Sequence, residues 1–205
     1  MRLTLHMFVT VDGVLQAPGA PEEDPDGAFG FGGWSAPYDD EDFGAAMTGW
    51  FEHATAFLLG RRTYEIFAGF WPKVVDPANP IASKLNELPK YVASQTLTSA
   101  DWHNSTVISD VVADVRELKE RPGDELQLHG SGGLAQTLIE HDLVDEYRLL
   151  TFPVRLGTGK KLFRDGARPS ALRLLSSSTT STGVVIAAYA PDGPPRLGSF
   201  TLEDG

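Results

Sequence analysis

Residues 125–138, ELQLHGSGGLAQTL, contain the pattern most suggestive of cofactor chemistry in this chain. Within them, residues 130–135 follow the spacing G-x-G-x-x-A, which in dinucleotide-binding proteins lies between a strand and a helix. Small residues at such a turn allow the backbone to approach a pyrophosphate, while the amides of the following helix point at it. On this segment alone, an ordinary glycine-rich connection is an equal alternative.

The position of this turn argues against a Rossmann domain. A Rossmann turn follows the first strand of the domain, and an acidic residue stands about 20 residues later. Here the turn comes late in the chain, position 155 is arginine, and only a hairpin is expected to follow. Any dinucleotide site is therefore expected on a different fold.

A second candidate anion site is Gly60-Arg61-Arg62-Thr63, where an apolar strand is expected to run directly into a helix. Arginines in the first turn of a helix oppose its dipole unless an anion binds there, and amides with guanidinium groups are typical of phosphate sites. The alternative is that Arg61 or Arg62 pairs with acidic residues of this acidic chain. Two such junctions fit a dinucleotide laid across the carboxyl edge of a sheet, where open α/β sheets bind ligands.

Other catalytic and metal motifs fail on their spacing. Residues 157–161, GTGKK, lack the first glycine and the Ser/Thr of a P-loop, and Ser131 lacks the preceding glycine of a nucleophile elbow. The chain has no cysteine, which excludes disulfides and thiolate metal sites. The five histidines show no ligand spacing, so we expect no metal; His129, at a strand end beside the glycine turn, is expected to be structural rather than to line a site.

The elements that would position these residues alternate between strands and helices, and then end in a hairpin. Expected strands cover residues 3–11, 55–59, 90–94, 105–109, 125–129, 143–154, 171–178 and 183–190; expected helices cover 39–53, 60–67, 78–88, 110–120 and the segment from the glycine turn to about His141. Asp110 is expected to cap its helix. This order predicts an α/β fold with a mostly parallel sheet and antiparallel strands at one end.

The length of 205 residues suits a single domain, with a Gly/Pro/Asp-rich surface loop at 17–40 and a C-terminal tail at 191–205. No apolar run approaches the roughly 18 residues of a membrane span, and no signal peptide is apparent, so we expect a cytoplasmic protein. The formal charge of −11 argues against nucleic-acid binding. An anionic cofactor would have to be captured locally, by helix N-termini and a few arginines.

Several segments resemble, in order, the dihydrofolate reductase-like superfamily. Within it they are most similar to stand-alone relatives of the reductase domain of the bifunctional riboflavin-biosynthesis deaminase/reductase. The segments are FVTVDGVL (8–15), LLGRRTYEIFAGFWP (58–72), KYVASQTL (90–97), residues 126–163 and the final hairpin, which together span most of the chain. The resemblance implies a dihydrofolate reductase-like three-layer fold, an NADPH cofactor, a small-molecule substrate and a homodimer.

The resemblance also implies roles for individual residues. The cofactor residues would be Gly60, Arg61, Arg62, Thr63, Ser94, Gln95, Gly130, Ser131, Gly132, Gly133, Leu134 and Ala135. Relatives often have a cis Gly-Gly at the glycine turn and a basic residue at the position of Gln95. The serine at 131 therefore leaves the cis bond open, and Gln95 leaves the choice between NADPH and NADH open.

Substrate residues would be Leu15, Trp34, Phe67, Pro153 and Arg155, with Trp50 and Trp71 as further candidates for an aromatic wall. Asp12 would face the substrate as a catalytic residue, with an ordinary Asp-Gly turn as its alternative. Dihydrofolate reductases carry a carboxylate on the helix before the second strand; counting back from Gly60 reaches Gly44, and a short gap would bring Asp42 to that position. The alternative for Asp42 is a solvated helix start.

The implied function is NADPH-dependent reduction of a small heterocyclic substrate, similar to the 5-amino-6-(5-phosphoribosylamino)uracil reductase of riboflavin biosynthesis. A dihydrofolate reductase and a non-catalytic nucleotide-binding or interaction protein are the two alternatives. The H-x-E and P-C-x-x-C motifs of the zinc deaminases are absent from this chain, which excludes zinc-dependent deamination by it.

Overall fold

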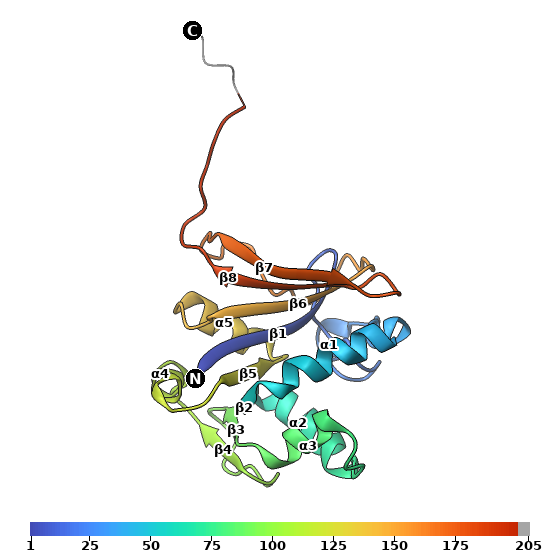
Figure 1. Ribbon diagram of the computed structural model, residues 1–205, viewed down its shortest axis with the longest axis vertical. Coiled ribbons are helices and arrows are strands. Elements are labelled where there is room, and N and C mark those ends of the chain that lie inside the picture. Colours follow the sequence, from blue (N-terminus) through green and yellow to red (C-terminus); the bar gives the residue numbers. More distant parts are fainter. Residues whose placement is uncertain (201–205) are drawn as a thin grey trace.

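Eight strands form one sheet in the order β4-β3-β2-β5-β1-β6-β8-β7 in the computed structural model, which describes residues 1–200 (Figure 1). The strands are β1 (Arg2–Thr10), β2 (Ala54–Gly60), β3 (Lys90–Ala93), β4 (Ser105–Ile108), β5 (Glu125–His129), β6 (Glu146–Phe152), β7 (Leu172–Thr179) and β8 (Val185–Pro191). Strands β1 to β6 are parallel, whereas β8 is antiparallel to β6 and β7. The predicted mixed sheet with a C-terminal antiparallel hairpin is confirmed.

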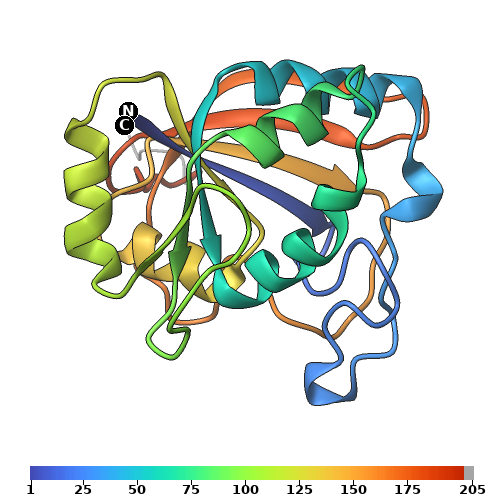
Figure 2. The same ribbon diagram turned by 90° about the horizontal axis from the view of Figure 1, so that it is seen from below.

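Helices cover both faces of this sheet (Figure 2). They are α1 (Glu41–Glu52), α2 (Arg61–Phe70), α3 (Pro80–Glu87), α4 (Val111–Glu120) and α5 (Gly132–Glu140), with three short 3-10 turns, η1 (Asp26–Ala28), η2 (Ala36–Tyr38) and η3 (Trp71–Lys73). Helices α4 and α5 share one apolar cluster with the sheet, and α1, α2 and α3 share another. This gives the predicted three layers.

Alternation along β1 explains how the central strand serves both layers. Leu3, Leu5 and Met7 are buried in the cluster that includes α4 and α5. The intervening residues, including Thr4 and His6, face the opposite side of the sheet because successive side chains of a strand alternate. Both sets are buried, as expected for a central strand of a sheet covered on both faces.

The predicted strand over residues 143–154 is shorter in the structure and covers Glu146–Phe152. The amide of Leu143 donates to the carbonyl of Leu138, so this residue closes the end of α5 before the strand begins. Pro153 follows the last strand residue and has no amide hydrogen to continue the ladder. Apolar Leu143 and Val144 are buried, which explains why the apolar run extended the predicted strand.

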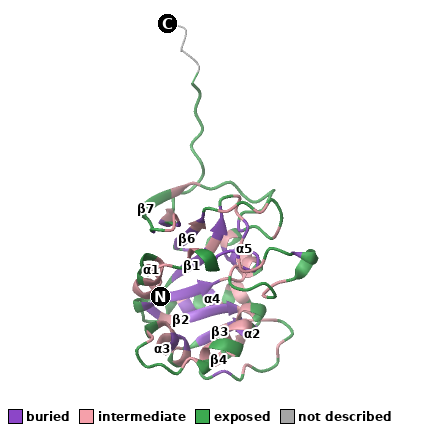
Figure 3. Cartoon of the chain, turned by 90° about the vertical axis from the view of Figure 1, so that its right-hand side faces the viewer, coloured by how far each residue is buried: buried purple, intermediate pink, exposed green. Residues whose placement is uncertain are grey.

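Residues 17–40 lie beyond the carboxyl ends of the strands (Figure 2), anchored by buried Phe29 and Trp34. The predicted tail at 191–205 begins at the sheet, since Pro191 ends β8 and residues 192–193 pair with Ala171. From residue 194 it is exposed and extends away from the sheet (Figures 1 and 3), while residues 201–205 lie outside the described part. Within residues 1–200, no helix is long and apolar enough to cross a bilayer.

Candidate functional site

The two predicted strand–helix junctions are in direct contact at the carboxyl edge of the sheet. Strands β2 and β5 are neighbours, and the amide of Gly60 donates to the Oγ of Ser131 at 2.8 Å. The Ser131 hydroxyl in turn donates to the Oγ1 of Thr63 at 2.7 Å. Segments 70 residues apart in the sequence therefore form one continuous polar surface.

Close approach at this surface requires small residues. A Cβ at Gly60 would lie 2.8 Å from the Ser131 Oγ, and a Cβ at Gly130 would lie 3.2 Å from the Thr63 Oγ1. Gly130 has φ 57° and Ser131 has φ 62°, so the turn is left-handed at two successive positions. No cis peptide bond occurs within residues 1–200, which resolves the question of the Gly130–Ser131 bond in favour of trans.

The first turns of α2 and α5 differ from those of the other α-helices. Asp40, Asn79 and Asp110 cap α1, α3 and α4 by accepting a hydrogen bond from a first-turn amide, as predicted for Asp110. No side chain of residues 1–200 caps α2 or α5 in this way. Their first-turn amides have no intrahelical partner, so both helices direct uncompensated positive ends at the same edge.

Arg61 extends this edge toward the end of β3. Its Nε donates to Glu65 at 2.7 Å, and its Nη1 donates to the Oγ1 of Thr96 at 2.8 Å. Thr96 belongs to the turn after β3, where its amide and that of Leu97 donate to the Oγ of Ser94. The structure therefore brings Arg61 beside the predicted segment Ser94-Gln95, of which Gln95 is exposed.

Arg62 pairs with two carboxylates of the 17–40 loop. It contacts Asp24 and donates to both oxygens of Asp26 at 2.8 and 3.1 Å. The Lys160 ammonium joins the same carboxylates at 2.6 and 2.7 Å. The hydrogen bonds from Arg62, followed by those from Lys160, hold the pKa of Asp26 far below its usual range. Pairing with acids, the alternative considered for the arginines, is thus observed.

Asp12 binds the backbone of the loop that follows β6. Its carboxylate accepts from the Thr10 hydroxyl at 2.5 Å, from the Gly157 amide at 2.7 Å and from the Leu156 amide at 3.3 Å. The Thr10 hydroxyl is the largest cause of its lowered pKa, and the two amides add to the shift against partial desolvation. The carboxylate therefore orders this loop.

Asp42 lies at the far side of the edge, beside the turn between β7 and β8. It accepts from the amide of Ser181 at 3.0 Å, while Asp40 accepts from Ser181 and Thr182. The structure gives Asp42 this turn as its partner and does not place it with the glycine turn.

The predicted substrate residues are spread over four environments. Leu15 lies against the glycine turn, where a Cβ at Gly132 would come within 2.9 Å of its Cδ1. Trp34 is buried against Phe152, whereas Phe67 packs with Trp71 in the cluster around α2 and α3. Pro153 and Arg155 are exposed. Leu15 is the one of these residues that the structure joins to the predicted cofactor surface.

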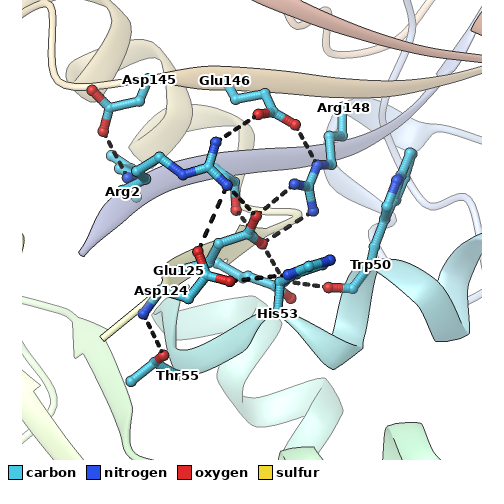
Figure 4. A network of polar contacts seen from close by, with 12 residues as sticks. Arg2, Trp50, His53, Thr55, Asp124, Glu125, Asp145, Glu146 and Arg148 are labelled. Carbon is cyan, nitrogen blue, oxygen red and sulfur yellow. Dashed lines mark hydrogen bonds and ion pairs between the residues drawn. The ribbon is translucent and has the colours of Figure 1, made fainter. Parts of the chain in front are cut away.

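A buried polar network beneath α1 was missed by the sequence reasoning (Figure 4). Glu125, fully buried, accepts from Arg148 at 2.5 and 3.0 Å and from Arg2 at 3.0 Å, and Glu146 pairs with both arginines. The alternation of polar residues at 2, 4 and 6, at 125, 127 and 129, and at 146 and 148 was its signal in the sequence.

Two imidazoles end this network near the glycine turn. Rings of His6 and His129 stack at 4.6 Å, and each is bonded within its own strand, to Thr4 and Gln127. Burial, followed by the charge of Arg148, lowers the pKa of His129 to about 3. Burial is also the main cause of the lowered pKa of His6. Both rings are neutral near pH 7, and His129 is structural as predicted.

Comparisons with known proteins give a consistent result. The family model of the RibD C-terminal domain matches residues 2–186. An uncharacterized protein of Bacillus subtilis, YyaP, is 30% identical over 194 residues, covering 94% of this chain and 96% of that protein. These matches span almost the whole sheet and all five α-helices.

Solved structures of similar fold include a putative riboflavin biosynthesis protein from Shewanella sp. PV-4, with a TM-score of 0.69 and 18% identity over 94% of this chain and 99% of that one. A pyrimidine reductase-like protein from Corynebacterium diphtheriae has a TM-score of 0.61 and 13% identity over 93% and 92%. A Thermotoga maritima deaminase/reductase has a TM-score of 0.59 and 15% identity, and the chain covers 56% of it.

Proposed function

Because the chain belongs to the RibD C-terminal domain family, we propose that it is an NADPH-dependent reductase of a small heterocyclic substrate. The observation that carries this proposal is the meeting of two uncapped helix N-termini at one glycine-lined edge. A cofactor diphosphate supplies the negative charge that these helix ends lack. The positive ends of these two helices would allow a chain of net charge −11 to hold an anion at this edge.

The residues present fit such a group. Gly60 and Gly130 leave the space for close backbone approach that a Cβ would fill, and a Cβ at Gly133 would meet no atom within 4 Å other than its own turn of helix. The hydroxyls of Thr63 and Ser131 and the first-turn amides of α2 and α5 would hold the diphosphate. Leu134 and Ala135 continue the same helix, but Ala135 is fully buried in the apolar cluster beneath α5 and would support the turn from below rather than touch the cofactor. Leu134, partly buried against the same cluster, would lie nearer to the nicotinamide ribose. Bound NADPH would supply the hydride.

The adenosine end would lie at the end of β3. Ser94 and Gln95 follow that strand, and the guanidinium of Arg61 reaches the same turn through Thr96. A guanidinium there favours a ribose 2′-phosphate over a 2′-hydroxyl because it provides a charged, multidentate donor. We therefore expect NADPH to bind more tightly than NADH.

The substrate would lie beside the carboxyl end of β1, against Leu15 and the loop that Asp12 orders. Exposed Arg155 in that loop would meet a phosphate or carboxylate of the substrate, and Pro153 would form part of the wall. The Thermotoga maritima relative is described as a 5-amino-6-(5-phosphoribosylamino)uracil reductase, and a phosphoribosylated pyrimidine is the substrate class we propose here. Asp12 would act on it by fixing the backbone of residues 156–157.

A homodimer is part of the proposal. The edge strand β7 is exposed along almost its whole length, with Leu174 and Leu175 about half exposed. Unpaired edges of this kind are typical pairing sites for a second chain. Equilibrium sedimentation is expected to give twice the monomer mass of 22.2 kDa.

Titration of tryptophan fluorescence with NADPH, and in parallel with NADH, tests the cofactor proposal. We expect saturable NADPH binding, with NADH at least tenfold weaker because it lacks the phosphate that Arg61 would bind. Arg61→Gln is expected to reduce the difference in affinity between NADPH and NADH, whereas Arg116→Gln, at an exposed position of α4, is the matched control. Absence of saturable binding by either cofactor would contradict the proposal.

A further inference from the structure

Two cations from distant parts of the chain meet at the border of the candidate cofactor site. Arg62 belongs to the first turn of α2, and Lys160 belongs to the loop after β6, 98 residues later in the sequence. Both contact the same two carboxylates, Asp24 and Asp26. The chain has 17 lysines and arginines against 28 aspartates and glutamates, so basic residues are scarce. Two of them nevertheless lie together at this point.

This cluster borders both strand–helix junctions. The carbonyl of Lys160 accepts from the Leu15 amide at 2.8 Å, and Leu15 packs against Gly132 at the start of α5. Gly132 follows Ser131, whose hydroxyl donates to Thr63, the neighbour of Arg62. Contacts therefore run in a closed path from Arg62 through the two carboxylates to Lys160, on to Leu15 and the glycine turn, and back through Thr63. The path includes first-turn residues of both uncapped helices.

The backbone that carries the two carboxylates is held in place by a buried residue outside the 17–40 loop. The Nε2 of Gln16, a side chain only 3% exposed, donates to the carbonyls of Asp24 and Asp26 at 3.0 and 2.9 Å. Its Oε1 accepts from the amide of Lys160 at 3.0 Å, and its own carbonyl accepts from Trp34. Gln16 thus holds the backbone of residues 24, 26 and 160 together, and their side chains meet outside it.

We propose that Arg62 and Lys160 form a phosphate-binding pair and that Asp24 and Asp26 are its internal occupant, displaced when a phosphate ester binds. Two adjacent carboxylates carry about the charge of one phosphate group and accept hydrogen bonds from the same donors. The exchange is therefore nearly balanced in charge. It couples occupation of the site to displacement of the Asp24 and Asp26 side chains, which lose their ion pairs with Arg62 and Lys160 while Gln16 still holds the backbone of both residues.

The phosphate ester has two possible sources, the cofactor diphosphate and a phosphate of the substrate. Arg61 does not share in this exchange, because its carboxylate partner Glu65 lies one turn further along its own helix. The inference rests on the proposed function, because that function supplies both phosphates. It adds Lys160 as a ligand-binding residue and assigns Asp24 and Asp26 as competitors of the ligand.

The test compares the dissociation constants of NADPH and of ribose 5-phosphate for the wild-type chain and three variants. Asp24→Asn with Asp26→Asn removes the internal occupant. Glu22→Gln with Asp39→Asn, two exposed acids in the same loop, removes the same charge away from the cluster. Lys160→Gln removes one cation and leaves both loop acids in place, so it reports on the site even where the loop of the first variant is disordered.

We expect the Asp24/Asp26 variant to bind at least fivefold more tightly than the Glu22/Asp39 control, and Lys160→Gln to bind at least fivefold more weakly than the wild type. Such changes for NADPH assign the pair to the cofactor, and changes confined to ribose 5-phosphate assign it to the substrate; both support the exchange. Unchanged affinities with NADPH still bound would overturn the exchange and leave the reductase proposal intact. Changes for ribose 5-phosphate in a chain that does not bind NADPH would overturn the reductase proposal alone.

Discussion

Polar residues gather in two regions of this molecule, at the carboxyl edge where α2 and α5 begin and beneath α1. At the edge, first-turn amides have no side-chain cap and Arg61 and Arg62 are half exposed. Beneath α1, Glu125 is fully buried and its carboxylate is satisfied by Arg2, Arg148 and Gln127. The first region keeps polar groups available to a ligand, and the second uses them on one another.

This difference shows that polar residues at strands indicate a functional site only where their hydrogen-bonding groups are free to bind a ligand. Buried ion pairs contribute little net stability but are expensive to break, because the remaining charge has no solvent. Uncapped helix ends and exposed arginines can exchange partners at small cost. Variants at the edge should therefore change binding with little effect on stability, and variants beneath α1 should do the reverse.

The largest expected effect is on stability, from Glu125→Gln. It leaves the buried guanidinium of Arg148 with Glu146 as its remaining carboxylate, and we expect a loss of about 3 kcal/mol in the free energy of unfolding. Urea denaturation measures this loss. Glu117→Gln, which breaks an exposed i,i+4 pair with Arg121, is the matched control and should cost less than about 0.5 kcal/mol. Equal losses of stability in the Glu125 and Glu117 variants would show that solvent reaches the network and that its ion pairs behave like surface pairs.

Acidification should weaken the region beneath α1 through His6 and His129. Their pKa values in the folded chain lie below the value of about 6.5 for an unfolded histidine, and that of His129 is about 3. Between pH 6.5 and 3 the unfolded chain binds protons that the folded chain excludes, so stability falls as pH falls. The slope is at most about 1.4 kcal/mol per pH unit for each ring.

Unfolding measured at pH 6 and pH 4 tests this origin. His129→Gln keeps a polar group in place and should reduce the fall by about 1 kcal/mol per pH unit. His103→Gln, at an exposed position, should leave the fall as in the wild type. If the His129 variant lost as much stability between pH 6 and pH 4 as the wild type, His129 would not be the source of the acid sensitivity.

The smallest expected free-energy change concerns the edge, from Gly133→Asp. An aspartate in the first turn of α5 is favourable for the helix dipole, and no heavy atom obstructs a Cβ there. The same carboxylate repels a diphosphate, so we expect NADPH to bind at least tenfold more weakly, about 1.4 kcal/mol, with stability unchanged or slightly raised. Gly133→Ala should bind within threefold of the wild type. Equal affinities of the two variants for NADPH would contradict a diphosphate at this turn.

Much of the fold was predictable because its signals are local. Apolar alternation, the Asp110 cap and the glycines after β2 and β5 each act within a few residues, and their order fixed which junctions share an edge. The direct contact between Gly60 and Ser131 was not predicted, because it depends on β2 and β5 being neighbours in the sheet, which the order of elements along the chain does not fix. The strand predicted over residues 143–154 was too long at its start because buried Leu143 and Val144 continue the apolar pattern of β6 without being paired in the sheet.

The partners of the charged residues were not predictable, because they depend on the paths of loops. Asp24 and Asp26 reach Arg62 through an irregular segment with no periodic pattern. Asp12 and Asp42 were singled out by motif and spacing, yet the structure shows that each holds the backbone of a neighbouring loop or turn. The alternating polar residues of β1, β5 and β6 indicate strands, but they do not show that α1 covers that face of the sheet.

The contrast between capped and uncapped helices is tested most directly by backbone amide chemical shifts during an NADPH titration of the uniformly ¹⁵N-labelled protein. We expect the largest changes at the first-turn amides of α2 and α5, residues 61–63 and 132–134. Amides at the starts of α3 and α4, which Asn79 and Asp110 already satisfy, should hardly move. Saturable NADPH binding that leaves residues 61–63 and 132–134 unshifted would contradict the central claim.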